Sequence, residues 1–157
     1  MSFKISKEQR EISVALSDGR ELSGYVFLGQ SMVNPGESVR VLELLESEER
    51  FLPFTTRQGE FLILTKSAIV AVSVPTEHEL RSLLSTGTDL YGKADLSVRM
   101  TAHDAIHGVL YIEPIEGFSR PFDEINRAKA FLTLHCQETT RILNVRHIVE
   151  IKIMGQR

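Results

Sequence analysis

The sequence predicts a mainly β protein made of two tandem five-stranded units, each a bent antiparallel sheet, joined by a short helix. The first observation behind this prediction is an internal repeat, because three blocks of the chain recur in the same order. The second is the alternation of apolar and polar residues within these blocks, which is typical of half-buried strands. The third is a glycine, Gly24 and then Gly108, at the same place inside the second predicted strand of each half.

The repeat also sets the predicted domain boundaries. Its paired blocks are residues 12–28 with 96–112, residues 40–54 with 120–134, and residues 63–74 with 142–153. The offset between counterparts falls from 84 (96 minus 12) to 80 (120 minus 40) to 79 (142 minus 63), so length changes fall between the blocks, as expected for loops. We predict a first barrel over residues 1–75, a linker with a short helix over 76–95, and a second barrel over 96–157.

Composition narrows the class of protein. The chain has 157 residues, of which 18 are basic and 21 acidic, and a net charge of −3. This balance argues against a surface built throughout for phosphate backbones. The single cysteine, Cys136, excludes an intramolecular disulfide and a cysteine-based zinc site. The first ten residues lack the apolar run of a signal peptide, and the longest apolar stretches are only strand-length, so we expect a soluble cytoplasmic protein.

In the first half, alternation over residues 12–16 predicts a strand, and Asp18-Gly19 suits a tight turn. The return strand over residues 22–28 contains Gly24, and a glycine inside a strand often marks a bend or a close approach of two backbones. A long loop follows. Further strands are expected over residues 51–54, 61–65 and 69–74, and their counterparts in the second half over residues 131–136, 140–144 and 148–153.

The linker carries signals of a short helix. Thr76 and Glu79 have the spacing of a capping box, and leucines at 80, 83 and 84 fall on one helical face. Gly87 stands where a C-terminal cap belongs. We therefore predict a helix over residues 77–85 that leads into the second barrel.

The repeated stretch 40–54, with its counterpart 120–134, is interpreted as the long loop and third strand of each half. We expect its larger apolar residues to cover the open end of each barrel and belong to the core: Leu42, Leu45 and Phe51, with Phe122, Ile125 and Phe131.

The same stretch contains a charged pair in each half, Arg40 with Glu43 and Arg120 with Asp123. Their i, i+3 spacing places both members on one side of a helical turn. One interpretation is a repeated charged handle that binds a partner. The favoured one is a local ion pair that stabilises the loop, worth well under about 1 kcal/mol if exposed. These four residues are the candidates for partner binding.

The predicted arrangement resembles the Sm/LSm small barrel, in which a helix precedes a bent five-stranded sheet with a long loop after strand two. The sequence ILNVRHI at 142–148 is similar to the turn between the last two strands of that family, with Arg146 in range and no glycine after it. The sequence KSAI at 66–69 resembles the Tyr-Lys-His-Ala-Ile pattern of the bacterial RNA chaperone Hfq, with Thr65 and Ser67 in place of the aromatic residue and the histidine. The repeated block at 40–54 looks more like a group of uncharacterised bacterial Sm-like or SH3-like domains.

The resemblance also implies an alternative function, single-stranded RNA binding. Asp123 and Asn126 resemble the Asp and Asn of the Sm loop, one residue closer together, and Glu43 and Glu46 take these places in the first half. The RNA-binding candidates are therefore Lys66, Asn126, Arg146 and His147. RNA recognition of single strands uses stacking groups and basic residues, whereas the first-half loop is acidic and would repel phosphate.

The sequence favours neither a metal site nor an enzyme. His103 and His107 would lie roughly 13 Å apart on a strand, at about 3.3 Å per residue, which is too far to share a zinc ion. His135 and Cys136 are adjacent, so on a strand their side chains face opposite ways. No Gly-rich phosphate loop, nucleophile elbow or cofactor motif stands out. We expect no metal, no cofactor and no catalysis.

The function expected from the sequence is a non-catalytic binding or scaffolding role. An open small sheet exposes edge-strand N–H and C=O groups that invite pairing with another strand. In Sm folds the last strands pair between subunits into rings, and here one half can pair with the other while the remaining edges pair between chains. The expected partner is a protein or a second copy, with no membrane. A third class of function is small-ligand binding where the two barrels meet.

Overall fold

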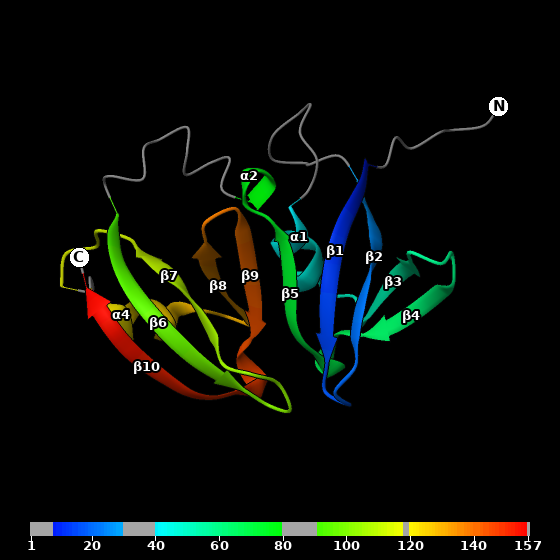
Figure 1. Cartoon of the computed structure of the whole chain (residues 1–157). Helices are drawn as coiled ribbons and strands as arrows, with labels where there is room; N and C mark the ends of the chain where they lie inside the picture. Colours follow the sequence, from blue (N-terminus) through cyan, green and yellow to red (C-terminus); the bar gives the residue numbers. More distant parts are fainter. Residues whose placement is uncertain (1–7, 30–39, 80–90, 118–119, 157) are drawn as a thin grey trace.

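The computed structural model describes residues 8–29, 40–79, 91–117 and 120–156. Within these ranges ten strands form one antiparallel sheet in the order β10-β6-β7-β8-β9-β5-β1-β2-β3-β4 (Figure 1). The prediction of a mainly β protein is confirmed. The two end strands, β10 and β4, are not neighbours in this order, so the described sheet is not closed.

The first half supplies five strands. Their bounds lie within two residues of the predicted ones, except that β1 begins four residues earlier. Its elements are β1 (Glu8–Leu16), β2 (Glu21–Leu28), α1 (Val41–Glu46), β3 (Phe51–Thr56), β4 (Phe61–Thr65), the 3-10 turn η1 (Lys66–Ala68) and β5 (Ile69–Pro75). The tight turn at Asp18-Gly19 is present, with Gly19 at φ +93°, a conformation that suits glycine.

The second half repeats this series of elements after the short helix α2 (Thr76–Glu79). Its elements are β6 (Gly92–Met100), β7 (Ile106–Ile112), α4 (Pro121–Arg127), β8 (Phe131–Cys136), β9 (Thr139–Asn144), the 3-10 turn η3 (Val145–His147) and β10 (Ile148–Gln156). The helix predicted over residues 77–85 lies outside the described residues from residue 80 onward.

The two halves have the same strand order and join through one strand pair. The first half runs fifth-first-second-third-fourth strand (β5-β1-β2-β3-β4), and the second runs β10-β6-β7-β8-β9 in the same sense. The junction is the antiparallel pair β5–β9, in which Ala71 lies opposite Leu143, Val72 opposite Ile142, Ser73 opposite Arg141 and Val74 opposite Thr140. The fifth strand of one half thus pairs with the fourth strand of the other.

Two hydrophobic clusters form the core, one for each half. The first gathers residues of β1 to β5 and α1, including the fully buried Phe54, together with Phe131 and Ile142 from the second half. The second gathers residues of β6 to β9, together with Val70 and Ala71 of β5. Each cluster therefore includes side chains from the other half, and the junction is part of the core.

The repeated glycines stand where two strands approach closely, as the sequence suggested. A Cβ at Gly24 would lie 2.1 Å from the backbone oxygen of Thr55 in β3. A Cβ at Gly108 would lie 2.8 Å from the Sγ of Cys136 and 2.9 Å from the Cβ of Leu134 in β8. Only glycine fits these positions, so the repeat preserves a requirement of the backbone.

Two expectations about the stretches 40–54 and 120–134 were wrong. Each contains a helix, α1 or α4, where a loop was expected. Phe51 and Phe122 are exposed, not core, because β3 buries the alternate residues Leu52 and Phe54 and because Phe122 lies on the outer side of α4. Leu45 and Phe131 are buried as expected, and Leu42 and Ile125 are partly buried against the core.

The capping box predicted at Thr76 and Glu79 does not form either. The backbone N–H of Thr76 donates to the Glu138 carbonyl at 2.8 Å. The carboxylate of Glu79 instead accepts hydrogen bonds from the first backbone N–H groups of α1. These groups have no partner within their own helix, so a buried acceptor from α2 satisfies them. Local spacing could not reveal this, because the partners lie almost forty residues away.

Candidate functional site

The strongest candidate surfaces are the two free edges of the sheet. Among the described residues, β4 pairs only with β3 and β10 pairs only with β6, so each presents a row of unpaired backbone groups on its outer side. Several of the exposed large apolar side chains lie on these strands: Phe61 and Ile63 on β4, and Val149, Ile153 and Met154 on β10. Edges that are both unpaired and apolar are typical of surfaces that associate.

The repeat gives these edges an internal comparison. At the offset of 79 residues, β10 is the counterpart of β5, and β4 is the counterpart of β9. Equivalent apolar positions are buried at the junction and exposed at the free edges. The exposed fractions are 0% for Val70 against 63% for Val149, 2% for Val74 against 50% for Ile153, and 0% for Ile142 against 56% for Ile63.

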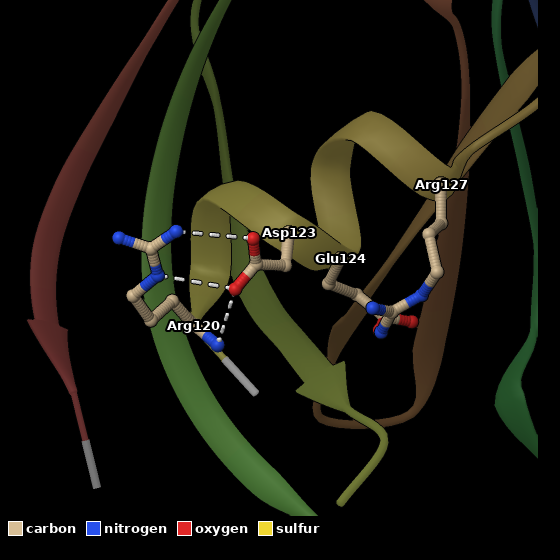
Figure 2. Close-up of polar contacts among 4 residues, drawn as sticks. All are labelled: Arg120, Asp123, Glu124 and Arg127. Carbon is tan, nitrogen blue, oxygen red and sulfur yellow. Dashed lines mark hydrogen bonds and ion pairs between the residues drawn. The ribbon is translucent and has the colours of Figure 1, made fainter. Parts of the chain in front are cut away.

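The charged pairs proposed for partner binding are both formed within the chain. The Nε of Arg40 lies 3.1 Å from Glu43, and the Nε of Arg120 lies 3.1 Å from Asp123 (Figure 2). Each arginine immediately precedes a helix, α1 or α4, at the same place in each repeat. The Arg120 side chain and backbone N–H both hydrogen-bond Asp123, which lowers the pKa of that carboxyl. These contacts are those of a local ion pair at the start of a helix.

The RNA-binding candidates are divided between two places. Lys66 and Arg146 line one open pocket of about 910 Å³, whose lining includes residues of the turns η1 and η3. Asn126 is on α4 and is not among the residues that line this pocket. His147 also has an internal contact, because its Nε2 lies 2.7 Å from the backbone oxygen of Ser67.

Lys66 itself serves the fold. Its ammonium donates to the backbone oxygen of Leu44 and to the hydroxyl of Ser47, both at 2.8 Å. These acceptors lie at the C-terminal end of α1, where carbonyl groups lack helical partners and a positive charge is favourable. Burial lowers the pKa of the Lys66 amine. Among the four candidates, Asn126 and Arg146 are exposed.

A cavity of about 350 Å³ lies between the halves, where the sequence suggested a ligand pocket. It is lined by Arg40 and Glu79 on one side and by Tyr91, Tyr111 and His135 on the other. The His135 ring packs against Tyr111 at 5.0 Å between centroids, and its Nδ1 lies 3.0 Å from the hydroxyl of Thr140. Burial lowers the pKa of His135 to about 4, so this imidazole is neutral at pH 7.

His103 and Cys136 have structural contacts. The Nε2 of His103 lies 2.7 Å from the backbone oxygen of Leu16, which ties the β6–β7 hairpin to the first half. The Sγ of Cys136 donates to the backbone oxygen of His107 at 2.7 Å, and burial raises the pKa of this thiol. Within the described ranges no group of three or more His, Cys, Asp or Glu side chains is placed to hold a metal ion.

Sequence reasoning missed the roles of three residues that the structure makes prominent. They are Glu79, which caps α1, His135, which lines the cavity between the halves, and Arg141 on β9. The repeat contained a signal for the last two. His135 aligns with Thr55 at the offset of 80, and Arg141 aligns with Leu62 at the offset of 79, so both mark places where the halves have diverged in chemistry.

Comparisons with known proteins give no match: no protein-family model matches the chain, and neither the curated proteins nor the solved structures contain a significant match. In the part of the chain that the structure describes, no helix has the length and apolar character needed to cross a membrane.

Proposed function

We propose that this protein is a non-catalytic scaffold that associates with further copies of itself, with β4 of one chain pairing with β10 of the next. The observation that carries this proposal is the β5–β9 junction. It joins the counterparts of the two free edges, and it buries the equivalents of Val149, Ile153 and Ile63. A strand added to an exposed edge gains main-chain hydrogen bonds, while alternate side chains provide specificity.

The proposal includes an interpretation of each half as a small barrel-like unit of the Sm-like or SH3-like kind. The repeated strand order and the separate core cluster of each half support it. The close approach of the second and third strands at Gly24 and Gly108 supports it further, because strands that cross closely allow a short sheet to curl. Each unit has one fourth-strand edge and one fifth-strand edge, and two linked units leave one of each free.

The junction also predicts the register between chains. Replacing each junction residue by its counterpart 79 residues away places Glu150 opposite Leu64, Ile151 opposite Ile63, Lys152 opposite Leu62 and Ile153 opposite Phe61. The contact is heterologous, because two different edges meet. Such contacts produce closed rings if the rotation between copies closes, and open chains if it does not.

Two single substitutions test the proposal on opposite edges. Ile63→Lys places a charge on β4, and Ile153→Lys places one on β10. Each variant alone is expected to be monomeric, because burying an unpaired lysine in the contact weakens association by roughly 100-fold or more. An equimolar mixture is expected to form a one-to-one dimer, since one edge of each variant remains intact. Sedimentation and light scattering at micromolar concentration measure these masses.

The matched control is Phe122→Lys, which places the same charge on an exposed phenylalanine of α4. It should associate as the unmodified chain does. A strictly monomeric unmodified chain would overturn the proposal, and so would a mixture of the two edge variants that stays monomeric. An Ile63→Lys variant that still dimerises would point to pairing of two β10 edges instead.

A further inference from the structure

A second surface, separate from the sheet edges, lies in a groove of about 1030 Å³ at the junction of the two halves. Its floor includes Ala15 of β1 and Ala71 of β5, whose short side chains leave room above the sheet. The β6–β7 hairpin forms one wall, and His103 of that hairpin holds it against the first half through the backbone oxygen of Leu16. Figure 1 shows this hairpin crossing toward the turn between β1 and β2.

Arg141 on β9 lines the groove and has an unsatisfied donor. Its Nε is buried and has no hydrogen-bond partner among the described residues, the only such buried side-chain atom in that part of the chain. The residues opposite it in the sheet are Ser73 on β5 and Leu134 on β8, so neither neighbouring strand places a carboxylate directly across from it. A buried donor without an acceptor destabilises a folded protein and calls for an explanation.

The repeat shows that an arginine is not required by the fold at this position. The counterpart of Arg141 in β4 is Leu62, an apolar residue in the same place of the same kind of strand. Of the two fourth strands, only β9, which lies at the junction, carries the guanidinium. Arg99 of β6 lines the same groove and adds a second positive charge.

Two carboxylates, Glu21 and Asp104, also line the groove. The Oε1 of Glu21, an exposed side chain, lies 3.7 Å from the Nδ1 of His103. Asp104 lies in the β6–β7 hairpin, and its carboxylate would compete with an external anion for Arg141. The described contacts nevertheless leave the Arg141 Nε–H without an acceptor, so an acceptor from outside the chain has a place there.

We propose that the junction groove binds an oxyanion, a phosphate or carboxylate group of a small molecule, through the guanidinium of Arg141. The planar guanidinium presents paired N–H donors that match two oxygens of such a group. Binding would satisfy the buried Nε and would take advantage of the nearby charge of Arg99. This site is independent of the proposed self-association, because it involves neither free edge.

Thermal unfolding with added anions tests the proposal on the full chain. The probes are inorganic phosphate and citrate, each compared with chloride at equal ionic strength. The unmodified protein should gain roughly 5–10 °C in Tm at an anion concentration about 100 times Kd. A response to phosphate alone identifies a phosphate site, and a response to citrate alone identifies a carboxylate site. No response to either, relative to chloride, overturns the proposal.

Variants assign the response to the groove. Arg141→Leu, which restores the residue of the other repeat, should abolish the shift while the chain still folds, because Leu62 occupies the equivalent position. Arg141→Lys keeps the charge and should weaken binding by about tenfold, since the paired donors are lost. Arg146→Leu, in the other basic pocket, is the matched control and should respond as the unmodified protein does. Asp104→Asn should strengthen binding by removing a competing negative charge.

An NMR measurement on Arg141 distinguishes binding in the groove from a general effect of salt on Tm. The Nε–H resonance of Arg141, assigned by its loss in Arg141→Lys, should move on addition of the anion that raises Tm. A Tm shift that persists in Arg141→Leu, or one that leaves this resonance unmoved, means that the anion binds elsewhere and overturns the assignment. Because both edge variants keep the groove intact, this experiment can fail while self-association is confirmed, and the reverse.

Discussion

The carboxylate of Glu79 lies 2.7 Å from the backbone nitrogen of Val41, so a residue from the segment between the halves caps the N-terminus of α1 in the first half. The second oxygen of Glu79 accepts from Leu42 at 3.3 Å. Arg40, at the N-cap position, makes no side-chain cap bond, so the cap comes from outside the helix. The position of α1 over the first core therefore depends on a residue that follows the last strand of that core.

Replacing Glu79 by alanine should destabilise the chain by about 1–2 kcal/mol, the usual effect of removing a helix cap. The carboxylate is buried, so water replaces its hydrogen bonds poorly. Urea unfolding followed by circular dichroism measures the change. Glu48→Ala, on the exposed turn after α1, is the control and should stay within about 0.5 kcal/mol of the unmodified chain. Equal effects of the two substitutions would show that Glu79 is no cap.

Lys66→Met should destabilise the chain by about 1–3 kcal/mol, because it keeps the apolar stem and removes the donor to Leu44 and Ser47. Lys129→Met is the matched control, since Lys129 lines the same pocket and has no part in the end of α1. Chemical unfolding at low and at high salt measures the loss of stability in each of the two variants. A loss of stability for Lys129→Met as large as that for Lys66→Met would contradict a specific role for Lys66.

His135 predicts a particular dependence of stability on pH. Its pKa in the folded chain is about 4, below the usual 6.5, so the unfolded chain binds a proton first as the pH falls. This contribution to stability is complete above pH 6.5 and is lost as the pH falls through the folded pKa, by at most about 3 kcal/mol. His135→Phe should remove that part of the decline. His107→Phe, at an exposed histidine, should leave the profile unchanged.

Gly24→Ala should destabilise the chain by more than about 2 kcal/mol, because the new Cβ would meet the backbone oxygen of Thr55. The same change at Gly108 should be milder, since the Sγ of Cys136 can move, although the Cβ of Leu134 cannot. Gly29→Ala is the control, because nothing lies within 4 Å of its added Cβ. Thermal unfolding of the three variants orders them. If Gly29→Ala were the most destabilised of the three variants, the close approach of β2 and β3 would be refuted.

The strands could be predicted because their evidence is local. Alternation places Ile12, Val14 and Leu16 on the buried side of β1, and the repeat supplies each strand a second time. The glycines were predictable for the same reason, because a backbone position with no room for a Cβ requires glycine, and that requirement is visible at a single residue. By contrast, the phase of β3 was misjudged, because Phe51, Leu52 and Phe54 are all apolar and the run alone does not say which residues face inward.

The candidate surfaces depend on contacts between distant segments, which sequence spacing does not encode. The free edges were expected at the long β-branched strands over residues 69–74 and 148–153. The second of these, β10, is a free edge, whereas the first, β5, is paired on both sides within the chain. The capping role of Glu79 depends on the packing of α2 against α1. Arg141 drew no attention because an arginine on a strand is ordinarily a solvated side chain. Its unsatisfied donor becomes visible only when β9 is placed beside β5.

The β5–β9 junction and the proposed β4–β10 contact differ in how they depend on protein concentration. Its strands belong to one covalent chain, so they meet at an effective concentration that is set by the linking segment, whatever the amount of protein in solution. The pairing proposed for β4 and β10 uses equivalent strands without that tether and must form at the bulk concentration. Diluting the protein should therefore dismantle the assembly one chain at a time and leave every junction intact. A tandem duplication has, on this view, fixed the smallest unit of assembly at two repeats.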